Sequence, residues 1–374
     1  MGYFARKHRA VEKLNYFKWG WGNVMHDTVL NYAVVGLGVG KAHAEAALNN
    51  PKLNLAAVCD IRDDRLEGAE EKYPGAKIVR DFDELCADPS IDALSLAVPS
   101  GLHAELAVKA LEAGKHVLVE KPIDITVEAA LKIKEAAERT GKTVGVAHQN
   151  RHNASMIAFR KALEEGLLGQ LFLGTFDVKW YRKQSYYEND GGWRGTWEMD
   201  GGGSLMNQAV HTVDLMRWLM GPVESVCSNW GIYAHDIKTE DCTASTIRFR
   251  SGACGTFVST TCAYPGVGTG IKLYGTKGSV EADADVLKLW KIDGGDPDDE
   301  AEMLETYGGG NAGMTKAGCG LLFGHAKVVD DFADAVLGGR KPAVGVDEAI
   351  DAVRIVRAVY ESAQTGKTVY FDQK

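Results

Sequence analysis

Three polar residues are spaced to share one face of an otherwise apolar helix in the middle of the chain. Residues 200–214 read DGGGSLMNQAVHTVD, in which Asn207, His211 and Asp214 stand at i, i+4 and i+7. Buried polar groups are costly without partners, so such a stripe needs a reason. A histidine flanked by an amide and a carboxylate is a candidate acid/base, because its ordinary pKa of about 6.5 allows proton transfer near neutral pH. A structural histidine fits the same pattern equally well.

A second group follows the apolar run HVLV at 116–119, which predicts a strand. Glu120 and Lys121 come directly after it, and Pro122 ends the strand. In open α/β sheets, ligands bind at the carboxyl ends of the strands. A lysine there could polarise a hydroxyl or carbonyl of a substrate, or hold a ribose. An ordinary solvated lysine at a strand end is the alternative interpretation.

A glycine turn, GLGVG at 36–40, lies between an expected strand and an expected helix. In that setting the first glycine permits the tight turn and the second lets the backbone approach a pyrophosphate at the helix N-terminus. Asp60, at the end of the next strand, would bind both ribose hydroxyls and repel a 2′-phosphate, which favours NAD over NADP. Arg62 and Arg65 lie close enough to soften that preference. Lys41 replaces the usual third glycine, so Gly40 is expected to pack the helix on the sheet.

Aromatic and arginine side chains crowd the segment before the His211 helix. They are Trp180, Tyr181, Arg182, Tyr186, Tyr187, Trp193, Arg194 and Trp197. Aromatic faces beside polar groups suit a sugar ring, although packing at a domain interface would explain some of them. No metal is expected, because the His211 stretch holds one histidine and no further ligand at a telling spacing.

Two kinds of sheet must position these residues. Over 31–150, short apolar runs alternate with helical stretches, which predicts βαβ units; the strands are expected at 32–35, 53–59, 77–79, 93–98, 116–119 and 143–146. After 150, long strands at 171–181, 223–233, 242–249 and 254–262 predict an antiparallel sheet open on one face. Ser204 is expected to cap a helix that ends at Met220. The acidic, glycine-rich stretch 293–311 is expected to be a surface loop, followed by helices at 325–337 and 346–364.

Composition narrows the class of protein. The 374 residues carry a net charge of −9, which argues against nucleic acid or an anionic membrane as the main partner. No apolar run approaches the length of a membrane span. The seven scattered cysteines form no C-x-x-C pair, so free thiols and a cytoplasmic location are expected. Residues 1–30 are basic and aromatic and lack the apolar core of a signal peptide; they predict an extension, either an arm that packs on a neighbour or a poorly ordered tail.

The joint pattern resembles the glucose–fructose oxidoreductase / inositol dehydrogenase / rhizopine-catabolism (Gfo/Idh/MocA) family over about residues 31–372. The matching pieces are GLGVGKAH at 36–43, AVPSGLH at 97–103, EKP at 120–122, and GGG with HxxD at 201–214. The resemblance implies an α/β fold: an NAD-binding Rossmann domain at 31–150 and a substrate-binding and oligomerisation α/β domain at 151–374, with a large, mostly antiparallel open sheet that commonly forms homodimers or homotetramers. It also implies that Lys121 and His211 serve the reaction. The family often has an aspartate at the position of Asn207, and an asparagine cannot act as a base.

The implied site follows from these motifs. The residues expected to bind the cofactor are Gly36, Gly38, Val39, Gly40, Asp60, Ile61, Arg62, Ala97, Pro99, His103, Glu120, Lys121 and Gln149. Those expected to bind the substrate are Lys121, Arg151, Tyr181, Trp193, Arg194, Asn207 and His211. The expected function is an NAD-dependent dehydrogenase that oxidises a secondary hydroxyl, with C3 of a pyranose sugar, sugar derivative or glycoside as its narrower form. The alternatives are a redox-neutral glycoside-cleaving enzyme that retains NAD, an inositol dehydrogenase, and an NAD-binding sensor without turnover.

Overall fold

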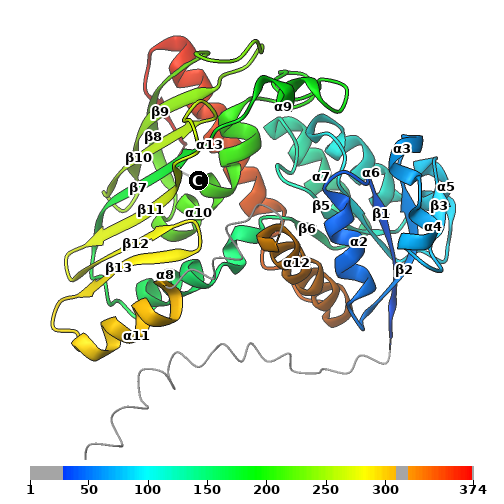
Figure 1. The fold of residues 1–374 in the computed structure, drawn as a ribbon, viewed down its shortest axis with the longest axis horizontal. Coiled ribbons are helices and arrows are strands. Elements are labelled where there is room, and N and C mark those ends of the chain that lie inside the picture. Colours follow the sequence, from blue (N-terminus) through cyan, green and yellow to red (C-terminus); the bar gives the residue numbers. More distant parts are fainter. Residues whose placement is uncertain (1–27, 309–318, 373–374) are drawn as a thin grey trace, which may run out of the picture.

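The computed structural model of the chain describes residues 28–308 and 319–372. The expected extension at 1–30 therefore lies outside the described residues except for its last three positions. Two domains stand side by side, each built on its own sheet (Figure 1). No helix in the described ranges is long and apolar enough to cross a bilayer.

The first domain is a six-stranded parallel sheet in the order β3-β2-β1-β4-β5-β6. Its strands are β1 (Leu30–Val35), β2 (Leu53–Cys59), β3 (Lys77–Val79), β4 (Ala93–Leu96), β5 (His116–Val119) and β6 (Val144–Val146). Its helices are α2 (Gly40–Leu48), α3 (Asp63–Leu66), α4 (Ala69–Lys72), α5 (Phe82–Ala87), α6 (His103–Glu112) and α7 (Val127–Thr140). The strand order reverses between β1 and β4, where doubly wound sheets bind dinucleotides. The predicted Rossmann domain is confirmed.

The second domain is an eight-stranded sheet in the order β13-β12-β11-β7-β10-β9-β8-β14. Its strands are β7 (Leu171–Lys179), β8 (Val223–Gly231), β9 (Cys242–Phe249), β10 (Cys254–Thr260), β11 (Gly268–Gly275), β12 (Gly278–Asp283), β13 (Val286–Ile292) and β14 (Val369–Tyr370). Only β7 and β10 pair in parallel, so the predicted, mostly antiparallel sheet is confirmed. Along β9, exposed and buried residues alternate, which leaves one face of the sheet open.

The helices of this part of the chain pack on the other face of that sheet, at its edge, or between it and the first domain. They are α8 (Ala154–Glu164), α9 (Gln184–Glu188), α10 (Val210–Met220), α11 (Pro297–Gly308), α12 (Cys319–Gly338) and α13 (Val346–Thr365). Helices α10 and α13 pack on each other and on the sheet, whereas α12 packs on α2 (Figure 1). Val329 and Phe332 of α12 join the core around Tyr32 of β1. A helix that follows the second sheet in the chain therefore completes the core of the first domain.

One predicted loop is wrong. The stretch expected to be a surface loop at 293–311 contains helix α11 over residues 297–308. Pro297 stands at its first position, where the missing N–H costs nothing, and three acidic residues fill its first turn, where the helix dipole favours them. The acidic residues that predicted a loop are therefore residues that favour the start of a helix. The sequence also predicts short strands at 272–274 and 286–290, which correspond to β11 and β13, whereas it does not predict β12 or β14.

Candidate active site

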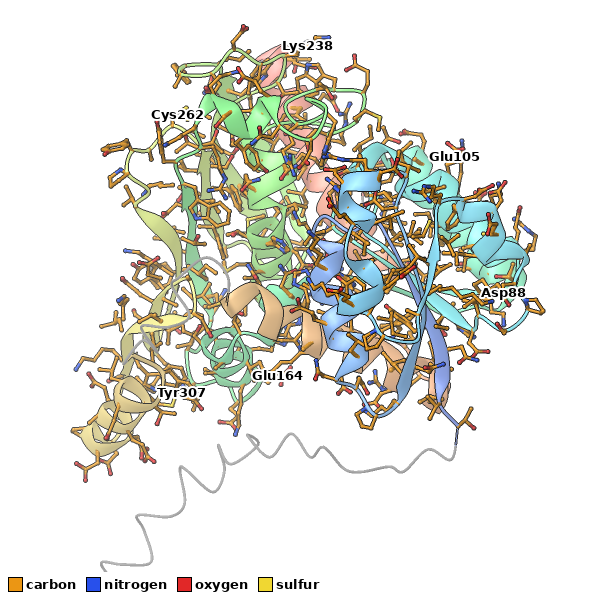
Figure 2. The ribbon with its side chains drawn as sticks, turned by 45° about the vertical axis from the view of Figure 1, so that its right-hand side comes forward. Asp88, Glu105, Glu164, Lys238, Cys262 and Tyr307 are labelled. Atoms are coloured by element: carbon orange, nitrogen blue, oxygen red, sulfur yellow. The ribbon has the colours of Figure 1, made fainter. Side chains whose placement is uncertain are left out.

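The two domains enclose one large cleft. On the first domain it is lined by the glycine turn and by the ends of β2, β4 and β5; on the second it is lined by the α9 region and the start of α10. Figure 2 shows the two domains side by side, with Lys238 and Tyr307 at opposite ends of the second domain and Asp88 on the outer side of the first. The cleft thus brings the predicted cofactor and substrate residues to one place.

The glycine turn has the shape that a dinucleotide requires. Gly36 has φ +87°, and a Cβ there would lie 2.4 Å from the carbonyl oxygen of Ala97, so the turn needs glycine. A Cβ on Gly40 would lie 3.1 Å from side chains of Val34 and Ala97, so Gly40 does pack helix α2 on the sheet. The first turn of α2 has neither a side-chain cap nor an acidic residue, which leaves its N–H groups for a phosphate.

Asp60 lies where the adenosine ribose is bound in such domains. It is buried at the end of β2, and its carboxylate accepts hydrogen bonds from the backbone N–H groups of Leu37 (2.7 Å) and Arg62 (3.0 Å). Gln149, which the sequence also places at the cofactor, lines the cleft with its Oε1 buried and unpartnered among the described residues. These groups fit an NAD(P) dinucleotide.

Most of the residues expected to bind the cofactor line this cleft. They are Gly36, Gly38, Val39, Asp60, Ile61, Arg62, Ala97, Pro99, Glu120, Lys121 and Gln149. His103 does not belong to the described lining. Its Nδ1 lies 2.8 Å from the carbonyl oxygen of Pro122 and its Nε2 lies 3.0 Å from that of Val98, so the nitrogen that carries the proton donates to one of these two carbonyls.

Lys121 reaches from the first domain to the second. Its Nζ donates to the backbone carbonyl of Asn207 at 3.0 Å. The preceding Glu120 is buried and accepts hydrogen bonds from the Nε2 atoms of His43 and His325, each at 2.9 Å. Desolvation lowers the pKa of Lys121, while the charges of Glu120 and Asp200 raise it. The desolvation effect is the larger, so the pKa of the Lys121 amine at the domain boundary is lower than usual.

The helix that carries His211 begins differently from the prediction. Residues Ser204–Ala209 form a π-helical segment, η3, that leads into α10. Ser204 does not cap it; instead the buried carboxylate of Glu240 accepts from the backbone N–H groups of Gly203 and Leu205, both at 2.7 Å. A Cβ on Gly203 would overlap the carbonyl oxygen of Glu240, at 1.8 Å. Such π turns often occur at functional sites, and this one breaks the regular spacing between Asn207 and His211.

His211 is buried on the cleft wall and lacks the expected carboxylate partner. Its Nδ1 has no hydrogen-bond partner among the described residues, and its ring stands edge-on to that of His148, with centroids 5.8 Å apart. Burial, and then the charge of Lys121, lower the pKa of His211 well below its usual value. The imidazole is therefore neutral at pH 7 and has a ring nitrogen able to accept a proton.

Arg151, expected to bind the substrate, is instead the partner of Asp214. Its Nη2 and Nε donate to the two carboxylate oxygens at 2.6 and 2.7 Å, and both side chains are buried. Arg151 is not among the described residues that line the cleft. This pair replaces the predicted contact between Asp214 and His211, because a bidentate arginine satisfies a buried carboxylate better than one imidazole.

Replacing Arg151 by methionine should lower the free energy of unfolding by about 3–5 kcal/mol, because it leaves a buried carboxylate unpaired. Arg160→Met is the matched control: Arg160 also lies over the ring of Trp218 and donates to its carbonyl oxygen at 2.8 Å. Its carboxylate partner Glu164 is exposed, so no buried charge is left unpaired and a loss of about 1 kcal/mol is expected. Urea unfolding measures both. An Arg151→Met protein with wild-type stability and a raised KM for substrate would restore Arg151 as a substrate contact.

The second-domain wall carries the other predicted substrate residues. Tyr181, Trp193, Arg194, Asn207 and His211 all line the cleft. The guanidinium of Arg194 lies 4.8 Å from the ring centroid of Trp193. These aromatic and cationic groups form a wall that suits a polar ring.

Two polar residues at this wall, Asp200 and Gln208, were assigned no role from the sequence, and Tyr186 was named only as one of the aromatic side chains. Asp200 is buried and accepts a hydrogen bond from the Asn207 amide, and burial raises the pKa of Asp200 to about 7. Tyr186 donates to Asn207 Oδ1 at 3.2 Å, and Gln208 donates to the same oxygen at 2.6 Å. The carboxyl that the family places at the position of Asn207 is thus present nearby, seven residues earlier. The hydrogen bond from the Asn207 amide to the Asp200 carboxylate follows from no periodicity in the sequence.

A parallel sheet with a dinucleotide cradle at its switch point, facing a lysine and a histidine in one cleft, defines an NAD(P)-binding oxidoreductase. The family description "Oxidoreductase family, NAD-binding Rossmann fold" matches residues 30–148, and "GFO/IDH/MocA C-terminal domain" matches residues 156–281. The chain belongs to the Gfo/Idh/MocA family of oxidoreductases.

Solved and curated relatives agree with this assignment. The WlbA dehydrogenase of Bordetella pertussis, solved with NADH and UDP-GlcNAcA, is 32% identical with a TM-score of 0.85, over 93% of this chain and 99% of that one. The scyllo-inositol 2-dehydrogenase (NADP(+)) IolW of Bacillus subtilis is 25% identical over 84% of this chain and 88% of its own. D-glucoside 3-dehydrogenase of Escherichia coli is 28% identical over 62% and 70%. These relatives are named for, or were solved with, sugars or inositols, and IolW and WlbA also with a nicotinamide cofactor.

Proposed function

We propose that the protein is an NAD-dependent dehydrogenase that oxidises a secondary hydroxyl, at C3, of a pyranose sugar, sugar derivative or glycoside. The observation that carries the proposal is the placing of Lys121 and His211 in the cleft that holds the dinucleotide cradle. The C3 position rests on the similarity to the glucoside 3-dehydrogenase, and a nucleotide-linked pyranose is suggested by the similarity to WlbA. Asp60 favours NAD as the cofactor.

The residues of the chain divide the chemistry between them. His211, neutral because burial lowers its pKa, accepts the hydroxyl proton. Lys121 stabilises the oxygen as negative charge develops on it. The cradle of Gly36, Gly38 and Asp60 would hold a nicotinamide dinucleotide, which would supply the acceptor for the carbon-bound hydrogen as hydride. The secondary alcohol would then become a ketone, with one reduced dinucleotide and one proton formed for each ketone.

The test is a panel of UDP-linked amino sugars, glycosides, free aldoses and inositols, followed for reduced nicotinamide and for products together. The proposal expects one equivalent of reduced nicotinamide per keto sugar. Cleavage of a glycosidic bond without net reduction would favour the redox-neutral alternative, and turnover of inositols alone would favour an inositol dehydrogenase. Heat stabilisation by NAD with no oxidation across the panel would favour the sensor.

We also propose a homodimer or homotetramer formed through the open sheet, in the cytoplasm. The alternating exposed face of β9 is available for such contact, and Tyr264 and Val267, near the end of β10, are exposed. Among the cysteines whose side chains the structure describes, all are free. Light scattering coupled to gel filtration measures the assembly.

A further inference from the structure

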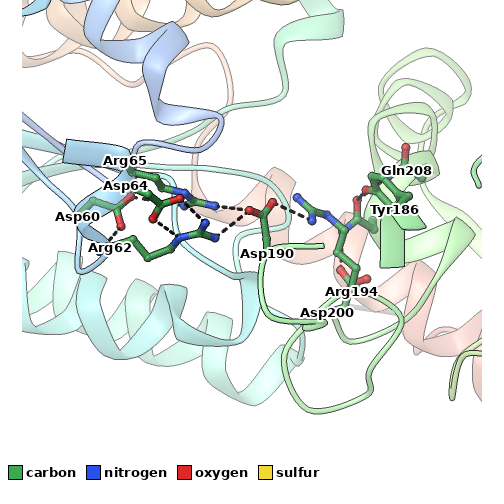
Figure 3. Close-up of polar contacts among 10 residues, drawn as sticks. Asp60, Arg62, Asp64, Arg65, Tyr186, Asp190, Arg194, Asp200 and Gln208 are labelled. Carbon is green, nitrogen blue, oxygen red and sulfur yellow. Dashed lines mark hydrogen bonds and ion pairs between the residues drawn. The ribbon is translucent and has the colours of Figure 1, made fainter. Parts of the chain in front are cut away.

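One carboxylate in the cleft is held by three arginines (Figure 3). Asp190 Oδ1 accepts from Nη1 of Arg62 and Nη2 of Arg65, both at 2.9 Å, and its Oδ2 accepts from Nη1 of Arg194 at 3.1 Å. Arg62 and Arg65 follow β2 in the first domain, whereas Asp190 and Arg194 belong to the second. Asp190 has φ 55°, a conformation that non-glycine residues adopt rarely, so its contacts hold it there.

The arginines lie within the proposed cofactor site. A Cβ placed on Gly38 of the glycine turn would be 3.3 Å from Nη1 of Arg65, and the same nitrogen lies 3.4 Å from Oδ2 of Asp60. Arg62 and Asp190 line the same cleft. Two cations therefore stand beside the carboxylate that meets the adenosine ribose.

This combination is ambiguous for a dinucleotide. In Rossmann domains an acidic residue after β2 binds the ribose of NAD, whereas a nearby arginine accommodates the 2′-phosphate of NADP. The chain has both, so Asp60 and the two arginines favour opposite cofactors. What occupies the arginines then decides between them.

We propose that Asp190 selects NAD against NADP by occupying Arg62 and Arg65 where a 2′-phosphate would otherwise bind them. A carboxylate and a phosphate both present anionic oxygens that accept hydrogen bonds from a guanidinium, so they compete for the same arginines. While Asp190 is in place, the charges of Arg62 and Arg65 are already neutralised, and the carboxylates of Asp60 and Asp190 repel a 2′-phosphate. Burial alone would raise the pKa of Asp190, but the hydrogen bonds from Arg65 and Arg194 lower it, so the group stays ionised. The inference rests on the proposed function for the position of the dinucleotide.

The selection comes from the substrate side of the cleft. Asp190 reaches across from the second domain, and its third partner, Arg194, lies over the rings of Trp193 and Tyr186, each 4.8 Å away. The discrimination therefore exists only while the two domains are in contact. Asp64, which also pairs with Arg62, belongs to the first domain, whereas Arg65 pairs with Asp190 at 2.9 Å and with Asp60 at 3.4 Å.

The test measures equilibrium binding of NADH and NADPH by nicotinamide fluorescence, at one ionic strength, without substrate. Asp190→Asn should lower the Kd for NADPH by about tenfold or more and change the Kd for NADH less than about threefold. Asp351→Asn is the matched control: Asp351 pairs with Arg217 and Arg354, its side chain is 32% exposed like that of Asp190, and it does not line the cleft. This control removes the same charge and should change neither Kd. Adding Arg65→Met to Asp190→Asn should abolish the gain.

Four results would overturn the proposal: wild-type protein that binds NADPH as tightly as NADH, an unchanged NADPH Kd in Asp190→Asn, equal changes for both dinucleotides, or the same change in Asp351→Asn. If wild-type protein binds neither dinucleotide, the proposed function fails together with it. If the wild-type protein binds NADH but Asp190→Asn has the same Kd for NADPH as the wild type, the selecting role of Asp190 fails and the proposed function stands. Thermal unfolding of each variant confirms that it is folded.

Discussion

Replacing Lys121 by methionine is expected to lower kcat by about 10³-fold while NADH binding stays within about threefold of wild type. Methionine keeps an unbranched side chain that lacks only the terminal amine, and it removes the charge that stabilises the developing alkoxide; one such donor is worth about 10²–10³ in rate. The variant also loses the contact of Nζ with the carbonyl of Asn207. Steady-state kinetics on the best substrate of the panel and NADH titration give the two numbers.

Lys115→Met is the control for this variant. Lys115 is also buried, and its Nζ donates to backbone carbonyls, those of Asp88 (2.6 Å) and Ile91 (2.9 Å), but it precedes the opposite end of β5. Its loss should reduce stability and leave kcat within about threefold. If Lys121→Met turned over as fast as Lys115→Met, the role assigned to Lys121 would be wrong.

Replacing His211 by asparagine should lower kcat by about 10²–10⁴-fold, the usual contribution of a general base. Asparagine is polar and smaller, but its amide cannot accept the proton. His148→Asn tests whether burial of a histidine alone matters, because His148 is as deeply buried and faces His211 edge-on. We expect a kcat within about tenfold of wild type for His148→Asn. Similar losses in both variants would make His211 a structural residue.

The pH dependence of kcat/KM distinguishes a catalytic His211 from a structural one, because a residue that only packs would not set the position of its acidic limb. Because burial lowers the pKa of His211 well below 6.5, its neutral form persists as pH falls and is lost only below that lowered pKa. The acidic limb of kcat/KM due to His211 should therefore lie well below pH 6.5. Burial raises the pKa of Asp200 to about 7, so the titration of Asp200 could produce a separate acidic limb in kcat/KM. The variant Asp200→Asn removes that limb. A limb near pH 6.5 that survives Asp200→Asn would contradict the assignment.

The first domain was predicted almost strand by strand, because its signals are local. Each buried parallel strand, such as Leu53–Cys59 and His116–Val119, is a short apolar run bounded by turn residues, and helix Val127–Thr140 has its Thr126 cap and its Gly141 stop in the sequence itself. The glycine turn and Asp60 follow from the same local logic. The positions of side chains at the ends of these strands could therefore be predicted from the sequence.

The second-domain wall was predicted less well, because distant contacts determine it. Glu240 replaces Ser204 as the group that satisfies the start of η3, from 36 residues further along the chain. Asp214 pairs with Arg151, 63 residues earlier, so that the helical spacing to His211 was not the relation that mattered. Asp190 and its arginine partner Arg65 are 125 residues apart. Spacing within one helix carries no information about such partners.

The central claim is that a secondary alcohol passes its carbon-bound hydrogen to nicotinamide in this cleft. The most direct measurement uses the best sugar of the panel with deuterium at C3, followed by mass spectrometry of the dinucleotide and the sugar after a single turnover. We expect one deuterium in the reduced nicotinamide and a ketone at C3 with the wild-type protein, and neither product with His211→Asn on the same timescale. Deuterium retained in the sugar, or released to water with NAD unchanged, would contradict it.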